Sequence, residues 1–186
     1  DKCSTRLIHL STDCVFSGKK GNYKEDDYPD ATDLYGKTKK AGEFNHHKHL
    51  TIRTSVVGHE IALSNGLLEW FLKQEENCDG YFNALFSGVT TNELSYIIAN
   101  YVINNKKISG LYHVGGIKIN KYALLRHFSN IYQKEIIILK DEKFKIDRSL
   151  NVKKFCNDTG YIKKDWKSMI EEMKEKEVVY RNLLKL

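Results

Sequence analysis

The stretch that decides the fold and the chemistry of this chain is STDCVFSGKKGNYKEDDYPDATDLYGKTKKAGE, residues 11–43. The short apolar run before it, RLIHLS at residues 6–11, is predicted to form a β-strand. A helix is expected to begin at Leu34, because Asp33 before it is a favourable N-cap residue. The stretch is therefore predicted to contain a strand end, a polar turn, an acidic loop and the first turns of a helix.

Tyr35 and Lys39 form a YxxxK pair on the predicted helix. Residues i and i+4 share one face of a helix, so the phenol and the ammonium can point into one site. A nearby cation favours the phenolate of a tyrosine, and such a pair can give or take a proton at a carbonyl or an alcohol. Thr12, or Ser11, at the end of the first strand could hydrogen-bond the reacting oxygen. The alternative is an exposed tyrosine beside a solvated lysine, but the surrounding pattern favours the catalytic pair.

Strands and helices alternate along the rest of the chain. Short apolar runs predict strands at residues 50–58, 110–116 and 135–139, and such runs are typical of sheets buried on both faces. Apolar residues at helical spacing predict helices, and the last of these is long, charged and expected at the surface: 34–47, 65–74, 92–104, 121–133 and 165–185. This alternation favours an α/β fold with a largely parallel sheet.

The composition is that of a globular protein, with 186 residues, 41% hydrophobic and 29% charged. No apolar run reaches the length of a membrane helix and the start does not resemble a signal peptide, so a cytoplasmic protein without a membrane span is expected. The formal charge of +6 does not come from basic blocks, because stretches such as KDEKFKIDR (residues 140–148) mix both signs. This pattern favours solvated surfaces over a nucleic-acid interface and fits an acidic small ligand equally well.

Cysteine and histidine spacing does not predict a metal site. The cysteines form no CxxC pair and are expected to be small buried side chains in a reducing compartment: Cys3, Cys14, Cys78 and Cys156. Three histidines gather near a predicted helix end, at residues 46, 47 and 49, without a carboxylate or cysteine at ligand spacing. A dinucleotide fingerprint is not visible either, because Gly18 and Gly21 are not followed by a third glycine.

Together these motifs resemble the extended short-chain dehydrogenases/reductases, in the branch of the dTDP-4-dehydrorhamnose reductases. Members of that family carry an STDYVFDG-like strand end, an acidic loop and an xYGxSKxxGE helix, where this chain has STDCVFSG, YKEDDYPD and LYGKTKKAGE. The likeness continues at LTIRTSVVG (50–58), FSGVTTNELSYIIANYV (86–102), GLYHVGGIKINKYALLRHF (110–128) and IDRSLNVKKFCNDTGYIKKDWKSMIEEM (146–173). It therefore covers nearly the whole chain.

The resemblance implies an α/β chain that holds the C-terminal portion of a Rossmann-type doubly wound parallel sheet plus a small mixed α/β substrate-binding domain. Residues 1–60 would be the remainder of the NAD(P)-binding domain and would carry the Tyr/Lys pair. Residues 61–186 would be mainly the substrate-binding part, with some segments returning to the sheet. The glycine-rich N-terminal cofactor-binding part of the family would be missing, so this stretch alone is expected to bind dinucleotides poorly and to turn nothing over.

The implied activity is NAD(P)H-dependent reduction of a nucleotide-linked 4-keto-6-deoxy sugar in cell-surface polysaccharide synthesis, such as dTDP-rhamnose biosynthesis. The cofactor, NADPH or NADH, would supply the hydride. Tyr35 would protonate the keto oxygen, Lys39 would support it and hydrogen-bond the nicotinamide ribose, and Thr12 would hydrogen-bond the same keto oxygen. Ser11 and Ser55 would contribute further cofactor contacts.

Four residues would contact the sugar nucleotide: Asp13, Cys14, Val56 and Arg148. The family often has tyrosine at position 14 and tryptophan at position 56, and both positions would face the substrate. Smaller side chains there reshape the sugar pocket, so a related keto-sugar nucleotide is as good a candidate as dTDP-4-dehydrorhamnose itself. Arg148 could pair with a diphosphate, or it could serve a surface or helix-capping role.

Two other functions are compatible with the same motifs. An epimerase or dehydratase of this superfamily uses the same Tyr/Lys pair, although a dehydratase usually adds an acid pair and Asp13 has no neighbouring glutamate. A non-catalytic regulatory subunit would keep the fold and bind a partner enzyme. The expected partners are a nucleotide-sugar substrate and, in a homodimer, a second copy of the chain, with no nucleic acid and no membrane.

Overall fold

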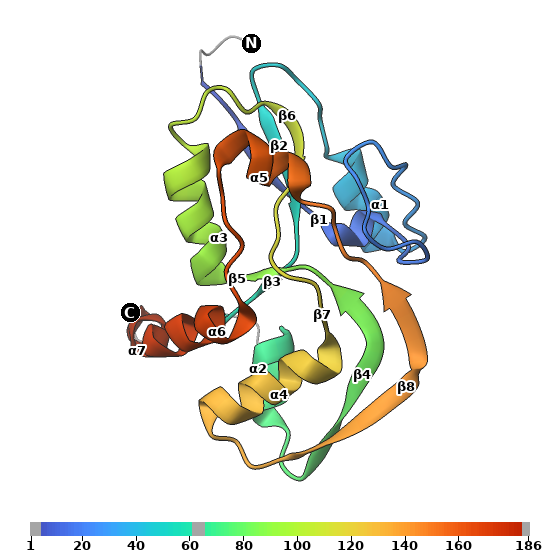
Figure 1. Cartoon of the computed structure of the whole chain (residues 1–186), viewed down its shortest axis with the longest axis vertical. Coiled ribbons are helices and arrows are strands. Elements are labelled where there is room, and N and C mark those ends of the chain that lie inside the picture. Colours follow the sequence, from blue (N-terminus) through green and yellow to red (C-terminus); the bar gives the residue numbers. More distant parts are fainter. Residues whose placement is uncertain (1–4, 61–65, 184–186) are drawn as a thin grey trace.

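A computed structural model describes residues 5–60 and 66–183 of the chain (Figure 1). A parallel three-stranded sheet with the order β1–β2–β6 occupies one end. Its strands are β1 (Ile8–Thr12), β2 (Leu50–Thr54) and β6 (Gly110–His113). All five residues of the central strand β2 are buried, as expected for a strand with neighbours on both edges and helices on both faces.

Helices cover both faces of this sheet. α1 (Leu34–Ala41) packs beside β1, α5 (Lys153–Thr159) packs beside β6, and Figure 1 places α1 and α3 (Thr91–Ile97) on opposite sides of the strands. A single 3-10 turn, η1 (Asp13–Val15), leaves the end of β1 and contacts α1, and a π-helical turn, η2 (Ile98–Val102), extends α3. Parallel strands between two layers of helices confirm the predicted α/β class.

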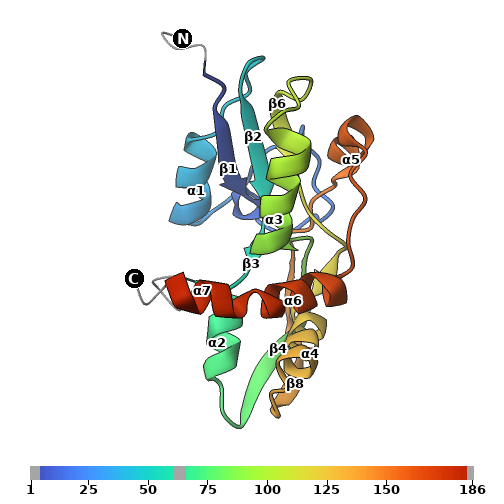
Figure 2. The same ribbon diagram turned by 90° about the vertical axis from the view of Figure 1, so that its left-hand side faces the viewer.

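A second sheet, with the order β7–β4–β8, forms the other end of the molecule (Figures 1 and 2). β4 (Asn77–Phe86) pairs in parallel with β8 (Ile137–Asp147) and antiparallel with the short β7 (Ile119–Asn120). The register between β4 and β8 shifts between Tyr81 and Asn83. This sheet is therefore mixed, whereas the first one is parallel.

Four helices accompany the second sheet. α4 (Lys121–Tyr132) packs on β4 and α6 (Trp166–Glu175) packs on α4, while α2 (Leu67–Lys73) and α7 (Glu177–Leu183) lie nearby (Figure 2). None of the helices in the described part of the chain combines the length and the apolar character that crossing a membrane requires.

A short parallel pair, β3 (Val56–Val57) and β5 (Val89–Thr90), lies between the two sheets. One cluster of buried apolar side chains runs through both ends, since it includes Ile52 of the first sheet and Phe128 of α4. The two sheets therefore share a hydrophobic core.

The start and end of α4 show how the local sequence sets the elements. The Asn120 side chain accepts a hydrogen bond from the Ala123 amide at 2.7 Å, which caps the first turn. Leu124 and Phe128 recur one turn apart and are fully buried. The helix stops at Gln133, whose φ of 55° lies in the left-handed region.

Several boundaries differ from the predictions for physical reasons. The predicted Asp33 cap is confirmed, because its side chain accepts from the Gly36 amide at 2.8 Å, but α1 ends at Ala41 rather than near residue 47. The helix predicted over residues 165–185 is interrupted at Lys176. Its first half, α6, is not a surface helix, because one face of it is buried in the core.

β4 is the main element that the sequence patterns do not predict. Its inward-facing residues do alternate, with Cys78 and Gly80 buried, but Asp79 and Asn83 interrupt the apolar pattern. β8 also extends further than predicted, into a charged stretch of sequence. It is an edge strand, so it can pair with β4 through its backbone while its charged side chains stay exposed. α5 was likewise absent from the predicted elements.

A buried ion pair ties the parallel sheet to the end of α1. Arg53 of β2 is 3% exposed, and its Nε and Nη2 donate to the two carboxylate oxygens of Glu43 at 2.8 and 2.7 Å. Ser11, at the end of β1, donates its hydroxyl to the same carboxylate at 2.6 Å. Glu43 follows the C-cap residue of α1, so its carboxylate links the end of this helix to both β1 and β2.

His113 of β6 extends this network. Its Nε2 lies 3.3 Å from Nη1 of Arg53 and its Nδ1 lies 3.0 Å from the Tyr23 carbonyl oxygen. Burial, and then the charge of Arg53, lower the pKa of His113 to about 3. A neutral ring fits both contacts, since Nδ1–H can donate to the carbonyl while Nε2 accepts from the guanidinium.

Glu43→Gln should destabilise the protein strongly, because it leaves the Arg53 guanidinium buried without a countercharge. We expect the free energy of unfolding to fall by about 3–5 kcal/mol in urea denaturation. Lys20→Met is the control, because it removes the exposed ion pair between Lys20 and Asp27, and should cost about 1 kcal/mol or less. Equal losses in the two variants would contradict the role assigned to the buried pair.

Candidate active site

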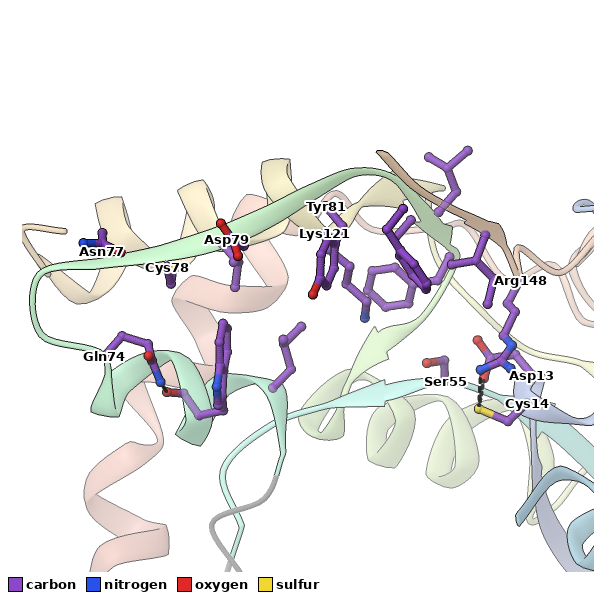
Figure 3. A pocket seen from close by; sticks show the side chains of 18 residues that line it. Asp13, Cys14, Ser55, Gln74, Asn77, Cys78, Asp79, Tyr81, Lys121 and Arg148 are labelled. Atoms are coloured by element: carbon purple, nitrogen blue, oxygen red, sulfur yellow. Dashed lines mark hydrogen bonds between the residues drawn. The ribbon is translucent and has the colours of Figure 1, made fainter. Parts of the chain in front are cut away.

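A cavity of about 780 Å³ lies between the second sheet and the carboxyl ends of β1 and β2 (Figure 3). Its walls come from η1, the residue after β2, α2, β4, the start of α4 and the end of β8. The lining is largely apolar and aromatic, with a few charged and amide side chains. A cavity of this size and character is typical of a small-molecule site.

Four of the residues predicted to form the site line this cavity: Asp13, Cys14, Ser55 and Arg148. Arg148 donates from Nε to the Phe16 carbonyl oxygen at 3.0 Å and from Nη1 to the Cys14 sulfur at 3.4 Å (Figure 3). Its Nη2 lies 3.8 Å from the carboxylate of Asp33, the cap of α1. The arginine therefore connects the end of β8 to η1 and to the first turn of α1.

Asp13 is 5% exposed, and its carboxylate accepts from the Thr12 hydroxyl at 3.2 Å. Thr12 also caps η1, since its Oγ1 accepts from the Cys14 amide at 3.1 Å. Burial raises the pKa of Asp13, although the charges of Lys121 and Arg148 oppose that shift. Burial and the Asp13 charge raise the pKa of the Cys14 thiol, so the thiol stays protonated and is not an activated nucleophile.

The predicted Tyr/Lys pair lies on α1, next to the cavity rather than in its wall. Tyr35 is 56% exposed, and Lys39 donates from Nζ to the Leu10 carbonyl oxygen of β1 at 2.8 Å. Gly36 between them is buried, and a Cβ there would overlap the Cys14 carbonyl oxygen. This close approach fits glycine alone and sets the first turn of α1 directly on η1.

The other residues singled out in the sequence have different surroundings. Ser11 is buried and bound to Glu43, and Val56 on β3 is 41% exposed and does not line the cavity. Cys78 is a buried free thiol in the wall, Cys156 is a half-buried one elsewhere, and Cys3 lies outside the described residues.

The residues that could hold the nicotinamide end of a dinucleotide gather at the carboxyl ends of β1 and β2. Ser11, Tyr35, Lys39 and Ser55 are the predicted ones. Within the described residues the Thr54 hydroxyl at the end of β2 is buried without a hydrogen-bond partner, so it adds an unused polar group to this end of the two strands. These groups fit that end of the cofactor, whereas the sequence offers no glycine-rich turn for its pyrophosphate.

Lys121 is the functional candidate that sequence reasoning missed. It is the first residue of α4, lines the cavity, and its ammonium lies 3.6 Å from the centroid of the Phe86 ring. Burial lowers the pKa of Lys121 to about 8, against the opposing effect of the Asp13 charge. A lysine at a helix start looks like any solvated lysine in the sequence. The aromatic wall residues Trp70 and Tyr81 were missed too, and for Tyr81 the cause is that β4 itself was not predicted.

Lys121→Met should remove a pH dependence of stability. The unfolded lysine keeps its proton up to a pH near 10.5, whereas the folded one releases it near 8, so the free energy of unfolding should rise with pH between these values. From about pH 7.5 to about pH 9.5 the rise should be on the order of 2 kcal/mol. Urea denaturation of the wild type and the variant across this pH range gives the contribution of Lys121 as the difference between their free energies of unfolding. The other titrating groups contribute equally to both proteins and cancel.

Lys118→Met is the control for that measurement, because the Lys118 ammonium is 3.6 Å from Asp147 and its side chain is 51% exposed. It should leave the pH dependence of the wild type unchanged. If Lys121→Met follows the same pH profile as the wild type, the ammonium is not desolvated in the folded chain.

Comparisons with known proteins agree with this architecture. Residues 1–178 match the sequence model of the family described as RmlD substrate binding domain. The structure is similar to dTDP-4-dehydrorhamnose reductase from Bacillus anthracis in complex with NADP, with a TM-score of 0.74, 18% identity, and coverage of 91% of this chain and 65% of that one. It is also similar to a hypothetical dTDP-4-dehydrorhamnose reductase from Sulfolobus tokodaii, with a TM-score of 0.71, 24% identity, and coverage of 87% and 62%.

A shorter match joins the chain to methionine adenosyltransferase 2 subunit beta of Bos taurus, with 51% identity over 37 residues, which are 20% of this chain and 11% of that protein. The chain spans just under two thirds of the length of the two solved reductase structures. Their likeness shows the Rossmann-type α/β fold, as predicted. Because the family model covers nearly the whole sequence, the chain belongs to the RmlD substrate binding domain family.

Proposed function

We propose that this chain carries the substrate pocket and the proton-donating pair of an NAD(P)H-dependent oxidoreductase that reduces a nucleotide-linked 4-keto-6-deoxy sugar. The observation that supports this most is the junction at η1. One side of η1 lines the cavity through Asp13 and Cys14, and its other side carries the YxxxK helix through the Gly36 contact. A ligand that fills the cavity up to η1 therefore ends beside the first turn of α1.

The chain's own groups would position the sugar and supply the proton. NADPH or NADH, when bound, supplies the hydride. Tyr35 would act as the general acid at the keto oxygen, and Lys39 would move from the Leu10 carbonyl to the nicotinamide ribose or bridge both. Thr12 would have to release Asp13 to reach the keto oxygen. Ser11 and Ser55 would contact the cofactor.

The substrate contacts would come from Asp13, Cys14 and Arg148, with Val56 at the border. The Asp13 carboxylate has hydrogen-bonding capacity toward the cavity and could accept from sugar hydroxyls. The short side chain of Cys14 leaves room at the sugar end of the cavity, which favours a sugar other than dTDP-4-dehydrorhamnose as much as that one.

The division of labour that we propose assigns residues 1–60 to the remainder of the NAD(P)-binding domain and residues 61–186 mainly to the substrate-binding part. β6 (Gly110–His113) supports this scheme, because it lies in the second stretch of sequence and pairs with β2 of the first. A cytoplasmic role in cell-surface polysaccharide synthesis, with the chain acting as a monomer or a homodimer, completes the proposal.

Two alternatives have support of their own. The Tyr/Lys pair would serve an epimerase or dehydratase equally well. The 37-residue match to a protein named as a subunit of methionine adenosyltransferase supports a role as the subunit of another enzyme. Both alternatives predict a different outcome in the assay below.

Tyr35→Phe should abolish turnover while dinucleotide binding persists, because it removes one hydroxyl and no bulk. We expect turnover to fall by about 100- to 10,000-fold. The assay follows NADPH and NADH oxidation with a panel of 4-keto-6-deoxy sugar nucleotides, using the protein expressed from its complete coding sequence. Tyr28→Phe, at an exposed tyrosine of the preceding loop, is the matched control and should keep full activity.

Unchanged turnover in Tyr35→Phe would rule out the role given to this phenol. If the wild type oxidises neither cofactor with any sugar of the panel and co-purifies with another enzyme, the subunit role replaces the reductase. If the sugar is instead interconverted or dehydrated without net consumption of the cofactor, an epimerase or dehydratase does.

A further inference from the structure

The cavity contains an ammonium group for which the described chain offers no acceptor. Lys121 has no hydrogen-bond or ion-pair partner within residues 5–60 and 66–183. Its ammonium makes a cation–π contact with the Phe86 ring, with 3.6 Å between Nζ and the ring centroid. The other cation of the cavity, Arg148, is already held by the Phe16 carbonyl and the Cys14 sulfur. Lys121 is therefore the cavity cation whose donors are available to a ligand.

Keeping this ammonium in the cavity costs free energy. Its desolvation is offset only in part by the aromatic face and by the attraction of Asp13, which is felt without direct contact. An oxyanion placed beside it would supply the missing hydrogen bonds and the countercharge together. The chemistry of Lys121 thus points to a negatively charged part of a ligand.

The position of Lys121 identifies which part. Figure 3 shows Gln74, Asn77 and Asp79 toward one end of the cavity and Asp13, Cys14, Ser55 and Arg148 toward the other, with Lys121 and Tyr81 between them. A nucleotide sugar has the same order of chemistry, with a hydroxyl-rich sugar, a doubly charged diphosphate and a nucleoside. The end with Asp13 lies next to the proposed proton donor, so the sugar belongs there.

We propose that Lys121 binds the diphosphate of the nucleotide sugar, with the sugar toward Asp13 and the nucleoside toward Gln74 and Asn77. The identity of the ligand rests on the proposed function, but the diphosphate contact does not require the redox reaction. The polar amides of Gln74 and Asn77 can hydrogen-bond a base or ribose, and the neighbouring Trp70 ring offers an apolar wall. Lys121 is thus a specificity-determining residue for a charged linker.

Isothermal titration of the protein expressed from its complete coding sequence with UDP and with dTDP tests the contact directly. Lys121→Met should weaken the binding of both nucleotides by about 10- to 100-fold, the usual effect of losing a charge-assisted hydrogen bond. Lys118→Met, which removes an exposed lysine three residues earlier, should bind like the wild type. The uncharged nucleosides uridine and thymidine should bind equally weakly to the wild type and to Lys121→Met.

Lys121→Arg separates a ligand contact from a structural role. It keeps a charge that does not titrate, so it should retain most of the affinity. The other titratable and charged groups that line the cavity are Asp13, Cys14, Cys78, Asp79, Tyr81 and Arg148. Above about pH 8 the wild type should lose affinity for UDP as Lys121 releases its proton, whereas Lys121→Arg should not. This comparison decides the matter even if Lys121→Met fails to fold.

Either of two results would overturn the proposal: a wild-type chain that binds neither UDP nor dTDP, or a folded Lys121→Met variant that binds them as tightly as the wild type. The reductase proposal fails separately. If UDP binding depends on Lys121 but no keto sugar is reduced, the diphosphate contact stands and the reductase does not. If Lys121→Met reduces a keto sugar with an unchanged KM, the reductase proposal stands and the diphosphate contact does not.

Discussion

The guanidinium of Arg53, buried at the centre of the parallel sheet, is the interaction on which the rest of the structure depends. An arginine in this position cannot lose its proton, so the surrounding chain must supply a carboxylate in a fixed, two-pronged geometry. Glu43 does this from just beyond α1, and the same carboxylate accepts from Ser11 of β1. One desolvated charge thereby fixes the relative positions of two strands and a helix, and His113 brings in a third strand.

α1 is consequently held at both of its ends. At its beginning, Gly36 lets the helix backbone approach η1 more closely than any side chain would permit. Beyond its other end, Glu43 is bound to Arg53. Tyr35 and Lys39 lie between these two anchors, which fix the position of the helix that carries them. This explains why the YxxxK pair is part of a longer pattern that includes the glycine after the tyrosine and the glutamate four residues after the lysine.

The sequence allowed the parallel sheet to be predicted because each of its strands is a short apolar run, and α1 because Asp33 is a recognisable cap. It also placed Asp13, Cys14, Ser55 and Arg148 at a site, through the family pattern, and all four line the cavity. The opposite wall could not be predicted. β4 mixes polar and apolar residues along its length, so its buried positions do not stand out. The special state of Lys121 arises from its burial against the Phe86 ring and opposite the charge of Asp13, residues that are distant in sequence and invisible to any local pattern.

The desolvated ammonium of Lys121 also bears on how this protein can evolve. Folding alone would not retain such a group, since an apolar side chain in the same place would remove the cost of desolvation. At position 121, therefore, a lysine lowers the stability of the fold and an apolar residue would lower the affinity for the ligand. Variants selected only for resistance to heat should lose the lysine early, and variants selected for ligand affinity should keep it and recover stability at positions outside the cavity wall.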